Sequence, residues 1–108
     1  MDEINATASA ELTNSIGLHA RPSVKLTKLA KKFESEIEVA ANEDGPWVDA
    51  KSIVKVMAVK AARGTTLHFR ARGPDAAAAL EALHDLVAQN FHDGDPAAAE
   101  QPAEDRNG

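Results

Sequence analysis

Alternation of apolar and polar positions, the period of a half-buried β-strand, recurs in three stretches of the chain. They are residues 5–12, 36–41 and 65–72. The first stretch has Ala6, Ala8, Ala10 and Leu12 on one face, so its strand prediction depends on the alternation rather than on strand propensity. Residues 42–46 have a loop composition, and residues 47–49 are therefore expected to form a hairpin with residues 36–41.

Helical spacing separates these predicted strands. Leu26, Leu29, Ala30 and Phe33 stand at i, i+3, i+4 and i+7, which predicts an amphipathic helix whose first turn contains Arg21-Pro22. A second helix is predicted after residues 73–75, on the apolar positions Leu80, Leu83 and Val87. Residues 51–59 suit a short helix as well as a strand. With a helix there, the order is β-α-β-β-α-β-α, an α+β fold with helices on one face of an antiparallel sheet.

The composition is that of one globular domain. The chain has 108 residues, 44% of them hydrophobic, with three Phe, one Trp and no Tyr. The core is therefore expected to consist of Leu, Val, Ile and Ala. The absence of cysteine excludes a disulfide framework and a thiolate metal site. The acidic N-terminus and the lack of a long apolar run predict no secretory signal, no membrane span and a cytoplasmic location.

Charge is distributed unevenly along the chain. The formal net charge is -5, but the residues beyond His92 contribute -4 of it, leaving the body nearly neutral. Residues 92–108 are expected to be a disordered acidic tail following a domain over residues 1–91. The predicted first helix has five basic residues, a patch suited to nucleic acid or to an acidic protein surface. Since no aromatic residue is interleaved with them, nucleic acid is the less favoured partner.

One segment between the first predicted strand and helix carries candidate chemistry. It reads Gly17-Leu18-His19-Ala20-Arg21-Pro22. His19 is predicted at or just before the helix N-cap, where unpaired N–H groups and the helix dipole favour an anion. A neutral imidazole is a nucleophile, and the guanidinium of Arg21 can bind phosphate oxygens. The segment therefore predicts a phosphoryl-accepting histidine, although a helix-capping histidine without function gives the same pattern.

The neighbouring residues favour a carrier over a hydrolase. No carboxylate lies close to His19 in the sequence to activate water, because Glu11 and Glu34 lie beyond the flanking elements. Glu34, Glu36 and Glu38 alternate along a predicted strand and are expected to form a solvated face. His68, His84 and His92 have no metal-ligand spacing, so no metal site is predicted.

Residues 17–22 closely resemble the active-site motif of the HPr family, the histidine-containing phosphocarrier proteins of the bacterial sugar phosphotransferase system. A second segment, residues 47–57, resembles the family's regulatory signature, in which a serine opens a short helix. The resemblance covers about residues 5–91. It implies an open-faced β-sandwich in which three helices cover one face of a four-stranded antiparallel sheet.

The resemblance also implies a function and its partners. His19 would take phosphate at Nδ1 from phosphorylated enzyme I, which obtains it from phosphoenolpyruvate, and pass it to a histidine of an EIIA-type protein. No cofactor is implied, and the carrier is expected to be a monomer, because it must dock onto two proteins in turn with the same face.

Roles for further residues come from the same resemblance. Arg21 would bind the phosphate, with Gly17 and the backbone of Ala20 shaping the site. Ser52 would be the residue that an ATP-dependent HPr kinase phosphorylates, although a serine there also suits a plain helix cap. The docking surface would comprise the apolar patch Ile53, Val54 and Met57, with Lys28 and Lys55 at its rim.

The chain departs from the usual family pattern in four places, one of which is the extra acidic tail after His92. The loop at residues 42–46 is longer by about two residues, and Ser23 stands where alanine is frequent. Residues 58–64 lack the glycines commonly found there, and Lys60 occupies one of their positions. Two other functions stay open, a carrier of a regulatory branch tied to nitrogen or carbon signalling, and a small acylphosphatase-like hydrolase.

Overall fold

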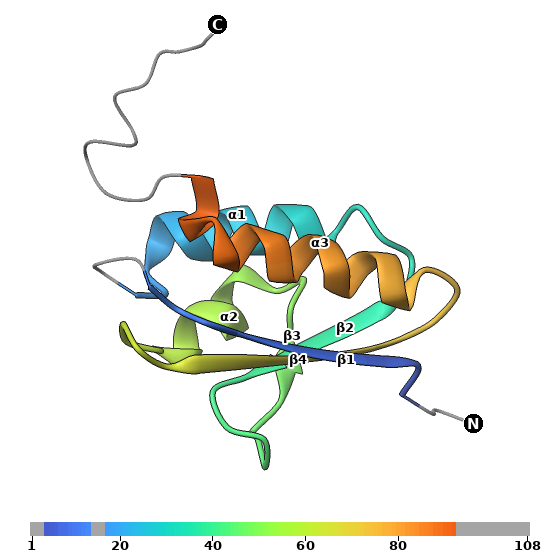
Figure 1. Ribbon diagram of the computed structural model, residues 1–108, viewed down its shortest axis with the longest axis horizontal. Coiled ribbons are helices and arrows are strands. Elements are labelled where there is room, and N and C mark those ends of the chain that lie inside the picture. The colour runs from blue at the N-terminus through green and yellow to red at the C-terminus, as the bar shows by residue number, and fades with distance from the viewer. Residues whose placement is uncertain (1–3, 14–16, 93–108) are drawn as a thin grey trace, which may run out of the picture.

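The computed structural model describes residues 4–13 and 17–92 (Figure 1). The elements follow the order β1 (Ala6–Glu11), α1 (Ala20–Ala30), β2 (Glu36–Ala40), β3 (Val48–Asp49), α2 (Ile53–Val59), β4 (Thr66–Arg72), α3 (Ala76–Ala88) and the 3₁₀ turn η1 (Asn90–His92). The predicted β-α-β-β-α-β-α order is confirmed. The predicted tail over residues 92–108 lies, after His92, outside the described residues.

The sheet has four strands in the order β1-β4-β2-β3, and every neighbouring pair is antiparallel. Helices α1 and α3 lie across one face of it (Figure 1), and α2 packs against α1 and β3. Alternation along β4 buries Leu67, Phe69 and Ala71 beneath the helices. The alanines of β1 face the same side, where their small side chains allow α3 to pack directly on the strand.

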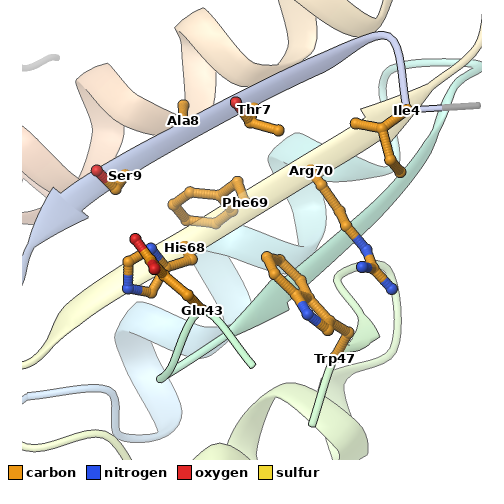
Figure 2. Close-up of a pocket in the computed structure, with 9 residues that line it drawn as sticks. All are labelled: Ile4, Thr7, Ala8, Ser9, Glu43, Trp47, His68, Phe69 and Arg70. Carbon is orange, nitrogen blue, oxygen red and sulfur yellow. The ribbon is translucent and has the colours of Figure 1, made fainter. Parts of the chain in front are cut away.

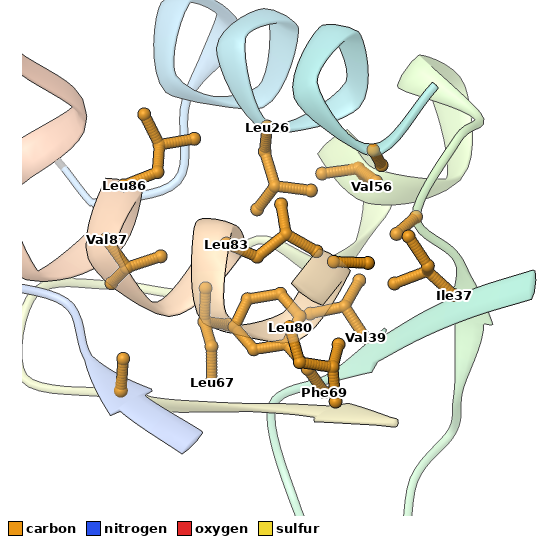
Figure 3. Close-up of a cluster of buried hydrophobic side chains, with 14 of the residues drawn as sticks. Leu26, Ile37, Val39, Val56, Leu67, Phe69, Leu80, Leu83, Leu86 and Val87 are labelled. Carbon is orange, nitrogen blue, oxygen red and sulfur yellow. The ribbon is translucent and has the colours of Figure 1, made fainter. Parts of the chain in front are cut away.

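The hydrophobic core fills the space between the sheet and the helices (Figure 3). Leu26 of α1, Val56 of α2 and Leu83 of α3 are fully buried there, above Val39 and Phe69 of the sheet. Burial of one such side chain stabilises the fold by about 1.5–3 kcal/mol. The three helices are therefore held to one sheet face by a shared core, as the open-faced arrangement requires.

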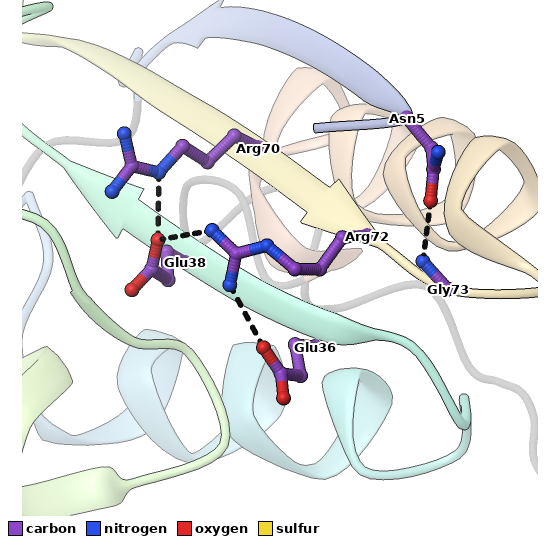
Figure 4. Close-up of polar contacts among 6 residues, drawn as sticks. All are labelled: Asn5, Glu36, Glu38, Arg70, Arg72 and Gly73. Atoms are coloured by element: carbon purple, nitrogen blue, oxygen red, sulfur yellow. Dashed lines mark hydrogen bonds and ion pairs between the residues drawn. The ribbon is translucent and has the colours of Figure 1, made fainter. Parts of the chain in front are cut away.

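On the uncovered face of the sheet, charged side chains form a connected network (Figure 4). Glu38 accepts a hydrogen bond from Arg70 Nε at 2.6 Å and lies 3.7 Å from Arg72 Nη2, while Glu36 pairs with Arg72 Nη1 at 2.8 Å. The guanidinium of Arg70 also stacks on the ring of Trp47, 4.2 Å from its centroid. The expectation of a simple solvated face was therefore wrong for Glu38, which is half-buried between two arginines.

Asp75 joins the start of α3 to the start of β2. Its carboxylate accepts hydrogen bonds from the Ser35 hydroxyl and from the N–H groups of Glu34 and Ser35. The hydrogen bond from the Ser35 side chain, followed by the one from the Glu34 N–H, lowers the pKa of Asp75 below its usual 3.8. The folded state therefore favours the ionised carboxylate.

Several element boundaries differ from the sequence prediction, and two of these differences place a predicted inward-facing residue outside its element. Helix α1 ends at Ala30, so Phe33 lies beyond the helix in the following turn, where it still packs against the core. The strand after it ends at Ala40, leaving the expected inward residue Ala41 outside β2. The ambiguous stretch at residues 51–59 contains a short helix, α2, which begins at Ile53.

Candidate functional site

His19 is the N-cap residue of α1, as the sequence predicted. Its backbone is extended, with φ -99° and ψ -163°, and its carbonyl accepts the first helical hydrogen bond from the Ser23 N–H at 2.9 Å. The imidazole makes no capping hydrogen bond to the helix, and the residue is exposed. The ring is thus accessible to an incoming group rather than used as a structural cap.

The surroundings of the imidazole suit an anion. The first turn of α1 has no acidic residue, and its N–H groups form the positive end of the helix dipole. Ala20 and Arg21 are the first two helical residues, and both are exposed. Pro22, the third, is buried and has no N–H to satisfy. A phosphoryl group on His19 would therefore meet a helix N-terminus and a guanidinium, with no carboxylate in that turn.

The loop that leads into His19 is fixed by the segment after α2. The Leu18 N–H donates to the Ala61 carbonyl at 2.9 Å, and the Leu18 side chain is 3% exposed. Gly17 has φ +75°, and a Cβ at this position would lie 2.6 Å from the Ala61 carbonyl oxygen. Glycine is therefore required both for the backbone conformation and for the close approach of the two segments.

A hollow of about 390 Å³ lies beside the histidine. It is lined by Leu18, His19, Met57, Lys60, Ala61 and Ala62. The hollow brings the predicted docking residue Met57 beside His19, and Met57 is 41% exposed. Lys60 also lines it, in the left-handed conformation with φ 56° and ψ 38°. At one of the positions where glycine is common, the lysine thus adopts the conformation that glycine favours.

Ser52 is the N-cap residue of α2, and its hydroxyl oxygen accepts a hydrogen bond from the Lys55 N–H at 3.3 Å. The helix that it opens carries the rest of the predicted docking patch. Val54 is 74% exposed, whereas Ile53 is half-buried. Lys55 is exposed on this helix and Lys28 is exposed on α1, but neither lines the hollow beside His19.

Comparison with known proteins decides the family. The family model described as "PTS HPr component phosphorylation site" matches residues 6–89, which include His19 and Ser52. The chain belongs to the HPr family of phosphocarrier proteins. The acylphosphatase-like hydrolase is thereby set aside, and the open-faced HPr fold is confirmed.

Named relatives agree with this assignment. The phosphocarrier protein HPr of Cupriavidus necator is 44% identical over 84 residues, covering 78% of this chain and 92% of the relative. A multiphosphoryl transfer protein of Vibrio cholerae is 51% identical over 78 residues, covering 71% of this chain but 20% of that longer protein. The phosphocarrier protein NPr of Escherichia coli K12 is 32% identical over 83 residues, covering 77% and 91%.

Solved structures show the same fold. The crystal structure of HPr-C-His from Thermoanaerobacter tengcongensis matches with a TM-score of 0.73 and 36% identity, covering 80% of this chain and 94% of that one.

His68, His84 and the open face of the sheet lie apart from the His19 site. His68 points to the uncovered face of the sheet and lines a hollow of about 600 Å³ with Trp47 and Arg70 (Figure 2). His84 is exposed on α3, 3.7 Å from the Asp85 carboxylate. Across residues 4–13 and 17–92, no cluster of three or more His, Cys, Asp or Glu side chains could hold a metal ion. None of the helices in these same ranges is long and apolar enough to cross a membrane.

Sequence reasoning missed most of the lining of the hollow beside His19. Leu18, Ala61 and Ala62 reach it through the backbone contact between two distant segments, which no local pattern encodes.

Proposed function

We propose that His19 carries a phosphoryl group, which it takes from phosphorylated enzyme I and gives to a histidine of an EIIA-type protein. The observation that carries this proposal is the exposed, uncapped imidazole at the N-terminus of α1 within a chain of the HPr family. The fold needs no histidine at this position for capping, since the ring makes no cap hydrogen bond.

The transfer requires one bond to form and one to break. The lone pair of the neutral His19 Nδ1 attacks the phosphorus of the donor phosphohistidine, a new P–N bond forms, and the donor P–N bond breaks with its electron pair returning to the donor ring. The guanidinium of Arg21 and the α1 N-terminus stabilise the charge on the phosphoryl oxygens. The second transfer repeats these steps with His19 as the donor.

The site also favours persistence of the phosphohistidine until an acceptor docks. Hydrolysis would need a base to activate water, yet neither the first turn of α1 nor the lining of the adjacent hollow contains a carboxylate. The apolar wall of Leu18, Met57 and Ala61 instead suits contact with a partner protein.

The decisive test compares two exposed histidines. Wild type, His19→Ala and His84→Ala are incubated with phosphoenolpyruvate and enzyme I, and the products are read by intact mass and by acid lability. An acid-labile phosphate on wild type and His84→Ala, with none on His19→Ala, is expected. Phosphate retained by His19→Ala, or none on wild type with any enzyme I tried, would contradict the proposal.

Arg21→Gln separates phosphate binding from nucleophilicity. With one charge-assisted contact to the phosphoryl oxygens removed, we expect transfer to His19 to slow by about 10-fold or more, since such a contact contributes about 1.5–3 kcal/mol. Arg21→Lys keeps the charge but lacks the planar guanidinium, so its transfer rate is expected to lie between those of wild type and Arg21→Gln. Equal rates for all three proteins would remove Arg21 from the site.

Ser52 is proposed as a site of ATP-dependent regulation by an HPr kinase. A phosphate at this N-cap would replace the hydroxyl that accepts from the Lys55 N–H, and the helix N-terminus would favour its charge. It would stand on the helix that presents Val54 and Met57, where negative charge would repel an acidic partner. Incubation with ATP and HPr kinase should label wild type and leave Ser52→Ala unlabelled, and the labelled protein should accept phosphate from enzyme I more slowly. Equal labelling of Ser52→Ala would contradict this role.

The HPr branch is proposed over the regulatory branch. The Cupriavidus HPr is 44% identical to this chain, against 32% for the Escherichia coli NPr. Transfer rates from the phosphorylated carrier to a sugar-branch EIIA and to a regulatory-branch EIIA decide between them, and faster transfer to the regulatory one would reverse the assignment. The carrier is proposed to be a monomer, which light scattering after size-exclusion chromatography tests directly.

A further inference from the structure

Lys60 combines two features that are unusual together. It follows the last residue of α2 and has φ 56° and ψ 38°, a left-handed conformation that glycine adopts without strain and lysine adopts at a cost. It is also exposed and lines the hollow that contains His19. Strained residues of this kind persist where the side chain contributes something that glycine would not.

The charge around this position has one sign. Residues 17–33 and 50–64 include α1, α2 and the His19 loop, and they hold nine of the twelve Lys and Arg residues but none of the seventeen Asp and Glu residues. Lys25 and Lys51 donate to the carbonyls of Phe91 and Phe33, so these two support the fold. The other seven are exposed. Lys60 is the lysine that this surface places in the wall of the hollow beside His19.

We propose that Lys60 is a specificity-determining residue, whose ammonium group pairs with a carboxylate beside the reacting histidine of an acidic partner protein. The ammonium extends from a backbone held against the His19 loop by the Leu18 to Ala61 hydrogen bond. A partner whose histidine meets His19 must cover the hollow, and its surface there faces a cation. Complementary charge at such a rim raises the association rate and excludes partners with basic surfaces.

This inference rests on the proposed function, because it takes the partner to be a protein that exchanges phosphate with His19. The experiment measures the Kd of enzyme I for each unphosphorylated variant. It also measures kcat, and the KM for the carrier variant, in phosphoenolpyruvate-driven transfer by enzyme I. Lys60→Gln removes the charge, Lys60→Arg keeps it, and Lys60→Gly removes it while relieving the backbone strain. Lys31→Gln is the matched control, an exposed lysine at the opposite end of α1 from His19.

At low salt, Lys60→Gln and Lys60→Gly are expected to raise Kd and KM by about fivefold and to leave kcat within about twofold, as for one ion pair at an interface rim. Lys60→Arg and Lys31→Gln should stay near wild type, and the differences should fade at about 0.5 M salt, where such pairs are screened. Lys60→Gly should also melt at a higher temperature than wild type, which shows that weaker binding is not a folding defect.

Three results would overturn the inference. The first is that Lys60→Gln binds enzyme I as tightly as wild type does. The second is that Lys31→Gln weakens binding equally, which would make the effect one of net charge, and the third is that Lys60→Gln lowers kcat and leaves KM unchanged. Failure of the proposed function gives a different pattern, in which wild type binds no enzyme I and accepts no phosphate.

Discussion

Gly17→Ala tests the contact that positions His19. Gly17 has φ +75°, and an added methyl group would lie 2.6 Å from the Ala61 carbonyl oxygen and 3.0 Å from Ala62 Cα. Both neighbours are backbone atoms, so no side-chain rotation relieves the overlap. The loop bearing His19 and the segment after α2 would have to separate.

The expected cost has two parts, and a second glycine isolates one of them. An alanine in the left-handed region costs about 1–2 kcal/mol, and forcing a methyl group into packed surroundings costs about 1–3 kcal/mol more. Gly64 has φ +92°, yet a Cβ there would meet no atom within 4 Å. Gly64→Ala should therefore lose about 1–2 kcal/mol, whereas Gly17→Ala should lose about 2–5 kcal/mol.

Urea unfolding followed by circular dichroism gives both free energies, and phosphoenolpyruvate-driven labelling gives the functional consequence. Gly17→Ala is expected to accept phosphate more slowly even where it is fully folded, because displacement of the loop moves His19. Gly64→Ala should be labelled as wild type is. Equal losses of stability in the two variants would refute the close approach of Gly17 to Ala61, and unimpaired labelling of Gly17→Ala would refute its link to His19.

Three further changes test the core, a helix and a turn. Ser23 is fully buried, and its hydroxyl has no hydrogen-bond partner among the described residues, so Ser23→Ala should raise the free energy of unfolding in urea by about 1 kcal/mol. Leu26→Ala should lower it by about 2–5 kcal/mol, because this fully buried side chain of α1 lies in the core between the helices and the sheet. Since the pKa of Asp75 is lowered in the folded state, its stabilisation is present above pH 3.8 and is lost as the pH falls further, so Asp75→Asn should be less stable than wild type at pH 7 and should approach it in acid.

The strands could be predicted from the sequence because alternation reports burial directly. The alternation was clearest in residues 65–72, and β4 buries Leu67, Phe69 and Ala71 as it predicted. Phe33 was placed wrongly within a helix because it keeps helical spacing and core contact although the helix has ended. Helix α2 has seven residues, about two turns, which is too short for a 3.6-residue period to be told from β-branched strand composition.

The candidate site also has features that the local sequence predicts and features that it does not. His19 at an N-cap and Pro22 in the first turn are local features, and the sequence predicted them. The hollow beside His19 depends on Leu18 meeting Ala61, two residues that are 43 positions apart, and on which face of α2 presents Met57. Local pattern carries no information on either, since each is decided by how the three helices share one core.

Gly17 and Lys60 show why a dihedral angle alone does not dictate glycine. Both have positive φ, and they lie on the two segments that the Leu18 to Ala61 hydrogen bond joins. At Gly17 the space for a side chain is filled by the opposing backbone, so strain and overlap add. The Lys60 side chain is exposed, so a side chain at this position costs only the free energy of the left-handed conformation. A single favourable contact with a partner is large enough to offset that cost. Residue 60 can therefore be a charged residue or a glycine, whereas any side chain at residue 17 would displace the loop that holds His19.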